Sequence, residues 1–287
     1  MSRPLAAAVA EATARLEAAG VPSPRHDAEV LAAHSLGVER GDLWRHAEVG
    51  AGFPAYVDRR AAREPLQHIT GVAWFRHLTL QVGPGVFVPR PETEVVVDAV
   101  LAALRGIERP RVVDLCTGSG AIALAVATEL PGSEVHAVEL EPAAHAWAAR
   151  NCEGSTVDLR LGDMATAFPE LEGTVDLLVS NPPYVPVGAV IRDPEVATHD
   201  PGAALWSGDD GLDAMRVVEQ VAARLLRPGG RVVAEHADLQ GTGAPEVFAA
   251  TGRWQDVADH QDLAGRDRFV TAVRIGATMT AGEGTAG

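Results

Sequence analysis

Four consecutive residues, Asn181-Pro182-Pro183-Tyr184, have the chemistry needed to bind a planar amino group. The Asn181 side-chain carbonyl accepts one N–H, and the Pro182 carbonyl can accept the other. Pro183 brings no competing N–H donor, and a residue before proline is held in an extended conformation. Tyr184 offers a flat face on which the group can stack. The tetrapeptide is therefore a candidate site for chemistry on an –NH2 group, although Asn-Pro and Pro-Pro also occur in ordinary turns.

The chain immediately before this tetrapeptide is apolar. Residues Val175–Ser180 have the composition of a buried parallel strand. In open α/β sheets, ligands bind just beyond the carboxyl ends of the strands. The tetrapeptide therefore lies where a substrate is expected, which favours the chemical interpretation over a simple turn.

A glycine-rich turn between an apolar strand and a helix forms a second candidate site. Asp114 lies near the end of the strand, and the helix is expected over residues 121–130. Glycines allow the backbone to approach a ligand closely, and the N-terminus of the helix offers free N–H groups. The turn itself consists of Cys116, Thr117, Gly118, Ser119 and Gly120.

Two classes of ligand fit this turn, a dinucleotide and S-adenosylmethionine. The next strand ends at Glu139, where a carboxylate can hold ribose hydroxyls. Cys116 replaces the first glycine of the dinucleotide fingerprint, and Asp114 would repel a pyrophosphate but attract the ammonium group of S-adenosylmethionine. After the third strand, Asp163 can accept the adenine amino group while Met164 packs on the ring, although Asp163 also suits a helix cap.

Strand-like and helix-like segments alternate from about residue 91, a pattern typical of a doubly wound sheet. We therefore predict an α/β fold with a mostly parallel, seven-stranded Rossmann-like sheet over residues 91–276. Residues 71–90 are expected to form a β-hairpin linker, and residues 277–287 a disordered tail. Pro228-Gly229-Gly230 is expected to form the turn into a late strand. The apolar strands are Arg111–Leu115, Glu134–Val138, Val157–Leu161, Val175–Ser180, Arg231–Glu235 and Arg268–Val273.

Residues 1–70 are predicted to form a small helical domain. Helical periodicity extends over residues 4–19, and a second helix is expected over Pro24–Leu36 with Ser23 as its N-cap. A third helix is expected over residues 53–63. A helical bundle of this kind carries no chemistry of its own, so a packing role and a partner-recognition role are both open.

Composition and charge restrict the class of protein. The chain of 287 residues has a formal net charge of −15 and contains no lysine, and nearly all of the negative charge lies after residue 75. Nucleic-acid-binding proteins usually show a basic footprint, so no direct nucleic-acid partner is expected. No apolar run approaches the roughly 18 residues of a membrane span, and the first residues do not resemble a signal peptide. Cys116 and Cys152 lack metal or redox spacing, so we expect no metal site, small core cysteines and a reducing cytoplasm.

Several segments match one protein family in combination. Besides Asn181–Tyr184 they are Arg63–Gly71, Phe87–Glu94, Asp114–Gly120, Leu205–Gly211 and Glu235-His236. With them the chain resembles, over nearly its whole length, the release-factor glutamine methyltransferases, which are class I S-adenosylmethionine-dependent enzymes. The tetrapeptide alone is shared with enzymes that methylate amino groups of DNA and RNA. Its combination with Arg90-Pro91-Glu92-Thr93-Glu94 is much more specific.

The resemblance implies a reaction and a set of site residues. The reaction is methyl transfer from S-adenosylmethionine to N5 of the glutamine in the Gly-Gly-Gln motif of peptide-chain release factors, with S-adenosylhomocysteine as product. The glutamine would bind at Asn181–Tyr184, with Phe87 and Glu235 as further candidates. Separately from the resemblance, we expect the helical domain to contact the protein substrate away from the glutamine. This chain departs from the family pattern at Cys116, where glycine is usual, and at Met164, where an aromatic residue is frequent. The implied cofactor contacts are Cys116, Thr117, Gly118, Ser119, Gly120, Glu139, Asp163, Met164 and Asn181.

The predicted catalytic residues are Asn181, Pro182 and Tyr184. An amide nitrogen is a poor nucleophile because its lone pair is delocalised into the carbonyl. We expect Asn181 and the Pro182 carbonyl to bind both N–H groups and so aim the lone pair at the sulfonium methyl. Two alternatives are an amino methyltransferase acting on adenine N6 or guanine N2 of nucleic acid, and a non-catalytic S-adenosylmethionine-binding protein. The acidic charge disfavours the first, and the intact tetrapeptide disfavours the second.

Overall fold

The computed structural model describes residues 4–276, and these form two compact units. The first unit comprises residues 4–73 together with Gln81–Val88 and Val190–Asp200. The second comprises Trp74–Leu80, Pro89–Ala189 and residues 201–276. The tail predicted over residues 277–287 lies outside the described part of the chain.

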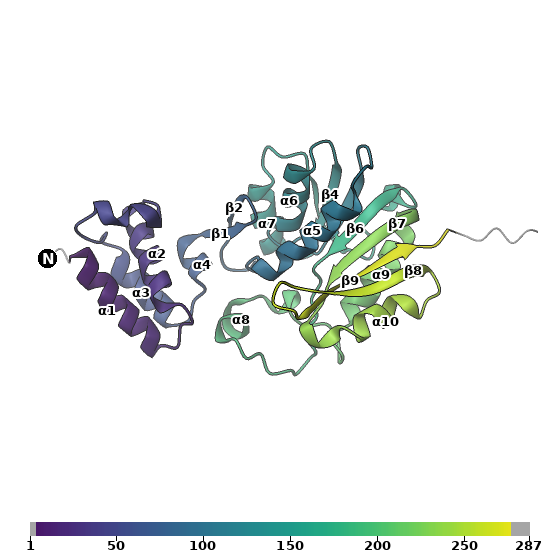
Figure 1. Ribbon diagram of the computed structural model, residues 1–287. Coiled ribbons are helices and arrows are strands. Elements are labelled where there is room, and N and C mark those ends of the chain that lie inside the picture. Colours follow the sequence, from purple (N-terminus) through teal and green to yellow (C-terminus); the bar gives the residue numbers. More distant parts are fainter. Residues whose placement is uncertain (1–3, 277–287) are drawn as a thin grey trace, which may run out of the picture. The chain divides into compact units, whose positions relative to one another are not determined.

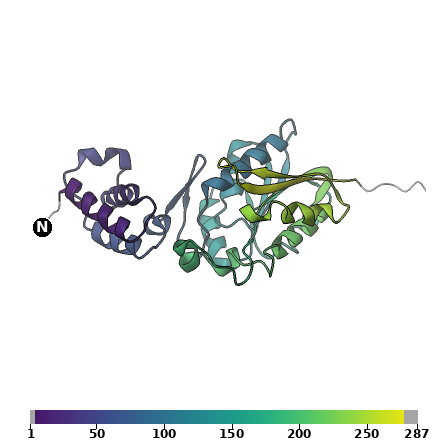
Figure 2. The same cartoon turned by 60° about the horizontal axis from the view of Figure 1, so that its bottom comes forward.

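The first unit is mostly helical (Figure 2), and most of its buried apolar residues come from α1, α2 and α3. α2 begins at Pro24 and ends before Gly37, whose φ of 66° terminates the helix. Ser23 occupies the N-cap position, but its side chain makes no capping hydrogen bond. The helical elements are α1 (Leu5–Ala18), α2 (Pro24–Leu36), η1 (Arg40–Arg45), α3 (Phe53–Ala61), α4 (Leu66–Thr70) and α8 (Pro194–His199).

A buried cluster of charges ties α8 to the other helices of this unit. Arg60 of α3 lies 2.8 Å from Asp27 of α2 and 2.8 Å from Glu195 of α8. Arg63 adds a second cation, 2.8 Å from the same glutamate oxygen. The chain leaves the second unit after Ala189 and re-enters it at Pro201, so this excursion is held by ion pairs to the helical unit.

The second unit is built on a seven-stranded sheet in the order β5-β4-β3-β6-β7-β9-β8 (Figure 1). The first five strands in this order are parallel, and β9 is antiparallel to both β7 and β8. The predicted α/β fold with a mostly parallel seven-stranded sheet is therefore confirmed. The strands are β3 (Arg111–Leu115), β4 (Glu134–Glu139), β5 (Asp158–Leu161), β6 (Val175–Ser180), β7 (Leu226–Glu235), β8 (Trp254–Gln261) and β9 (Asp267–Arg274).

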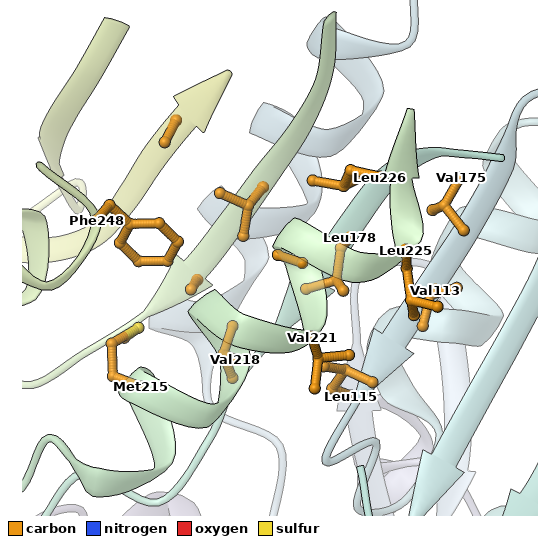
Figure 3. Packing of buried hydrophobic residues seen from close by; sticks show 14 of the residues in the cluster. Val113, Leu115, Val175, Leu178, Met215, Val218, Val221, Leu225, Leu226 and Phe248 are labelled. Carbon is orange, nitrogen blue, oxygen red and sulfur yellow. The ribbon is translucent and has the colours of Figure 1, made fainter. Parts of the chain in front are cut away.

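Neighbouring residues of a strand point to opposite faces of the sheet, and in the central strands both sets are apolar. Helices therefore cover both faces of the sheet. Val112 packs with the α5 and α6 side chains, whereas Val113 packs with those of α9 and α10. Figure 3 shows the second layer, in which Val218 and Val221 of α9 lie with Leu115 and Leu178 of the sheet. The helices are α5 (Glu94–Ala103), α6 (Ala121–Glu129), α7 (Pro142–Asn151), α9 (Asp213–Leu225) and α10 (Gly243–Ala249). Short 3-10 turns are η2 (Pro91–Thr93), η3 (Pro169–Leu171), η4 (Gly202–Ala204) and η5 (Asp238–Gln240).

Two sequence-based expectations about strands were wrong. Pro228-Gly229-Gly230 lies inside β7 as a bulge, because Leu226 already pairs with Val175 while Arg231 pairs with Leu177. The edge strand β8 was not predicted, since its polar residues are partly exposed and lack an apolar run. The expected hairpin exists as β1 (Val72–Phe75) and β2 (Leu78–Gln81) in a separate two-stranded sheet.

Among residues 4–276, no helix has both the length and the apolar character needed to cross a membrane.

The charge cluster of the helical unit leads to a stability prediction. Arg60→Leu leaves Asp27 and Glu195 largely buried without their shared cation, so we expect a loss of about 3–5 kcal/mol in unfolding free energy. Hydrogen exchange of the α2 amides measures this loss within the helical unit. Arg25→Leu is the matched control: Arg25 pairs with Glu29 but its side chain is 82% exposed, so we expect about 0.5 kcal/mol or less. If both substitutions lowered the unfolding free energy by the same amount, burial of the Arg60 ion pairs would not be the reason for their contribution to stability.

Candidate functional site

The two sequence-predicted sites lie at the same edge of the sheet. β3 pairs with β4 on one side and β6 on the other, so the direction of chain winding reverses at β3. In the register of β3 and β6, Leu115 lies beside Ser180. The Ser180 hydroxyl donates to the Leu115 carbonyl over 2.8 Å, which fixes the two strand ends to each other. The glycine-rich turn and the Asn181–Tyr184 tetrapeptide thus start side by side, at the switch point where open α/β sheets bind ligands.

Positive φ angles and backbone hydrogen bonds shape the glycine-rich turn. The Gly118 N–H donates to Glu139 Oε2 over 2.8 Å, and Gly120, with φ of 84°, leads directly into α6. Cys116 also has a positive φ, 59°. This conformation costs a residue with a side chain about 1–2 kcal/mol, which gives a physical reason for the glycine usual in the resembling family. Cys116 is half-buried, so the prediction that both cysteines are core residues holds fully only for Cys152.

Asp114 is a fully buried carboxylate with one unused oxygen. Its Oδ2 accepts from the Thr117 hydroxyl over 2.6 Å and from the Ala123 N–H over 3.2 Å. Its Oδ1 has no hydrogen-bond partner among the described residues. Burial raises the pKa of Asp114 to about 7. A buried acceptor without a partner is costly, and a bound cationic group would remove that cost.

Glu139 ends β4 and is also buried. Its two oxygens accept from the N–H groups of Gly118 and Glu141, each over 2.8 Å. Burial raises its pKa above the ordinary value. Each carboxylate oxygen has two lone pairs, so the side chain can accept further hydrogen bonds from a ligand.

The third predicted cofactor segment, Asp163-Met164, follows β5. Asp163 is exposed, and its Oδ1 accepts from the Ala165 N–H over 2.8 Å. This bond stabilises a turn, and since no helix begins at Asp163 in the described chain, the alternative expectation of a helix cap is wrong. Met164 is half-buried, with its sulfur 3.5 Å from the Cys116 sulfur. The structure therefore brings Met164 to the glycine-rich turn, and the adenine contacts of both residues stay predictions.

The tetrapeptide is braced by the segment around Leu205–Gly211. Val185, just after Tyr184, pairs with Trp206 and donates from its N–H to the Leu205 carbonyl over 2.7 Å. Gly211 has φ of 76°, and a Cβ there would lie only 2.4 Å from the Tyr184 carbonyl oxygen. Tyr184 itself is half-buried, and desolvation raises the pKa of its hydroxyl. This bracing explains why both segments belong to one pattern.

A buried polar cluster lies behind Asn181. The Asn181 Nδ2 donates to the Thr93 hydroxyl over 3.4 Å. Glu235 ends β7 and is 2% exposed, and the Thr93 and Asn181 side chains are close enough to lower the pKa of its carboxyl. Burial raises the pKa of Glu235 to about 7. Sequence reasoning gave Thr93 no role; the only signal was its place in the Arg90–Glu94 segment.

Two remaining residues are not brought to this cluster. His236 follows Glu235 and faces the other way, with its ring nitrogens 2.8 Å from the Ala237 carbonyl and 2.7 Å from Asp259. It connects β7 to the edge strand β8. Phe87 belongs to the first compact unit, whereas Asn181 belongs to the second. Its contact with a substrate therefore stays a prediction.

Comparisons with known proteins identify the relatives of this chain. The PrmC N-terminal domain matches residues 7–71, and the methyltransferase small domain matches residues 77–193. The release factor glutamine methyltransferase of Streptomyces coelicolor is 60% identical over 93% of this chain and 97% of its own length. The release factor glutamine methyltransferase of Mycolicibacterium smegmatis is 50% identical over 94% of this chain and 98% of its own length.

Two further matches are named for other substrates. A 4-amino-L-phenylalanine/4-methylamino-L-phenylalanine methyltransferase of Streptomyces pristinaespiralis is 44% identical over 94% of this chain and 95% of its own length. The solved structure of a T. thermophilus 16S rRNA N2 G1207 methyltransferase in complex with AdoMet and guanosine has a TM-score of 0.52 at 23% identity. It covers 71% of this chain and 49% of that chain, and it shows a shared fold. The identity along almost the whole of both chains shows that this chain belongs to the release factor glutamine methyltransferase family.

Proposed function

We propose that the protein transfers a methyl group from S-adenosylmethionine to the side-chain amide nitrogen, N5, of the Gly-Gly-Gln glutamine of peptide-chain release factors. The observation that carries this proposal is the pairing of Leu115 with Ser180. It sets a turn suited to the cofactor beside a tetrapeptide suited to an amide group. Membership of the family supplies the substrate class, and a cytoplasmic location follows from that substrate.

The residues around the turn fit S-adenosylmethionine. The unpartnered Asp114 Oδ1 would accept from the ammonium group of the ligand, and Glu139 would accept from its ribose hydroxyls. Met164 lies beside the turn, where it would contact the adenine ring. Bound there, S-adenosylmethionine supplies an electrophilic methyl group and leaves as S-adenosylhomocysteine.

The tetrapeptide would orient the substrate amide for attack. The Asn181 side-chain carbonyl and the Pro182 carbonyl would accept hydrogen bonds from the two N–H groups of the glutamine amide. This would direct the lone pair of the amide nitrogen towards the methyl group of the cofactor. Orientation of reacting groups can contribute roughly 7–11 kcal/mol. As the bond from nitrogen to the methyl group forms and the S–CH3 bond breaks, the nitrogen would become cationic and its N–H acidic. The proton would then be lost to water, so no strong base is required before transfer. Tyr184 would stack on the flat amide.

A second candidate substrate is a free aromatic amine. The Streptomyces pristinaespiralis relative is named for such an amine, and an arylamine presents the same two N–H donors. An exocyclic amine of nucleic acid also has these donors, but the net charge of −15 opposes binding to a phosphate backbone.

Methyl transfer from labelled S-adenosylmethionine distinguishes these substrates. We expect label on an intact release factor but not on the factor whose Gly-Gly-Gln glutamine is replaced by alanine. The Asn181→Ala enzyme should lose orders of magnitude in turnover while its cofactor affinity changes much less. Label on 4-amino-L-phenylalanine or on nucleic acid, with none on the factor, would show that the proposed substrate is wrong.

Asp114 gives the cofactor site a specific pH dependence. With a folded-state pKa of about 7, the carboxylate is charged above that pH and is neutralised as the pH falls through it. Affinity for the cationic ligand should therefore weaken from pH 8 to pH 6. Asp114→Asn should bind about 10–100-fold more weakly at pH 8, the value of a charge-assisted hydrogen bond, and lose this part of the pH dependence. Calorimetric titration measures both, and an unchanged pH profile in the variant would exclude Asp114 as the ammonium partner.

We further propose that the helical unit recognises the release factor away from the glutamine. A groove of about 700 Å³ lies between α1 and η1. Apolar residues such as Leu5, Val9 and Leu43 line it together with the charged side chains of Glu17, Arg25, Glu29 and Arg40. Trp44 borders it and is 76% exposed. A large exposed aromatic side chain beside a groove of apolar and charged residues is typical of a protein-binding surface.

The groove yields a prediction on kinetics. Trp44→Ala should raise the KM for the intact release factor about tenfold and leave kcat unchanged, because it removes binding energy far from the reacting atoms. Leu263→Ala is the control, since Leu263 is 98% exposed on the second unit. An unchanged KM in the Trp44 variant would remove the groove from substrate recognition.

A further inference from the structure

The amide of Asn181 can bind the substrate in only one of its two orientations. Its oxygen accepts hydrogen bonds, whereas its nitrogen only donates them. A substrate amino group brings donors, so the Asn181 oxygen has to face the substrate and the Asn181 nitrogen has to face the protein. A rotation of the side-chain amide by half a turn would place donor against donor and abolish this binding.

The residues behind Asn181 accept hydrogen bonds at its nitrogen. The Asn181 Nδ2 donates to the Thr93 hydroxyl over 3.4 Å. The Thr93 and Asn181 side chains both favour the ionised form of Glu235, as side chains that donate to a carboxylate do. An ionised carboxylate can only accept hydrogen bonds. Next to an ionised Glu235, the Thr93 hydroxyl and the Asn181 amide therefore both have to act as donors.

We propose that Thr93 and Glu235 are positioning residues that fix the amide orientation of Asn181, so that its carbonyl oxygen faces the substrate. The role rests on the proposed function, because it presumes a substrate with an amino group. Neither residue has to touch the substrate. Thr93 is 4% exposed and immediately precedes α5, and Glu235 is 2% exposed at the end of a central strand. Both are therefore held by rigid elements.

The protonation state of Glu235 determines the pH range in which it can fix the orientation of the Asn181 amide. Arg268 favours the ionised carboxylate, whereas Glu92 disfavours it, and Tyr184 is close enough for Glu235 to raise the pKa of its hydroxyl. Burial outweighs these and raises the pKa of Glu235 to about 7. The carboxylate is present above this pH. As the pH falls through it, Glu235 gains a hydrogen, can donate, and no longer excludes the reversed amide.

Substitutions of Thr93 separate positioning from packing. Thr93→Val keeps the shape of the side chain but removes the hydroxyl, and we expect kcat to fall about tenfold or more. Cofactor affinity, measured by calorimetry, should change less than about twofold, because the glycine-rich turn is untouched. Thr93→Ser restores the hydroxyl and should recover most of the lost kcat. A Thr93→Val enzyme with wild-type kcat would overturn the proposal.

A spectroscopic test does not depend on any substrate. The chain contains only two asparagines, Asn151 and Asn181, so protein labelled with 15N-asparagine gives two side-chain NH2 signals. We expect the Asn181 signal to titrate with a midpoint near pH 7 in the wild type and to lose this titration in Glu235→Gln. Asn151, which donates to the Ser119 carbonyl over 2.9 Å, is an internal control for Glu235→Gln, because its signal should be the same in both proteins.

The two tests separate this inference from the proposed function. If the Asn181 signal titrates through Glu235 but the wild type methylates no glutamine, the proposed substrate is wrong and the orientation of Asn181 stands. If the wild type methylates the glutamine but the Asn181 signal is indifferent to Glu235→Gln, the positioning role is wrong and the function stands.

Discussion

The parallel pairing of β3 with β6 is the constraint on which the rest of the site depends. Because Leu115 lies beside Ser180, β3 and β6 end next to each other at the same edge of the sheet. The glycine-rich turn follows β3, and the Asn181–Tyr184 tetrapeptide follows β6. A shift of this register would separate the two, however well each turn were formed.

Burial of charge is the second physical theme of this unit. Asp114 and Glu235 are both fully enclosed, and desolvation raises the pKa of each to about 7. Each also has an oxygen without a partner among the described residues. Stability alone would favour apolar side chains at such positions. Their presence at the carboxyl edge of the sheet is typical of a site whose energetic cost is offset by ligand binding.

Much of the fold could be predicted from the sequence because the central strands are apolar and separated by helices. β3 and β6 have the predicted bounds, Arg111–Leu115 and Val175–Ser180. The edge strand β8 could not be predicted in this way, since its stability comes from pairing with β9 rather than from an apolar pattern. The site was predictable where neighbours in sequence act together, as in Asn181–Tyr184. Thr93 was not, because its role depends on residues brought together only by the fold.

The excursion over residues 190–200 has a consequence for how this protein can be divided. Its Glu195 is paired with Arg60 and Arg63, which belong to a segment more than a hundred positions earlier in the chain. The helical unit is therefore assembled from pieces that enclose the tetrapeptide in the sequence, and no single cut removes it cleanly. A chimaera that exchanges this unit between relatives has to carry both segments, because the two arginines and Glu195 stabilise the unit only when all three are present.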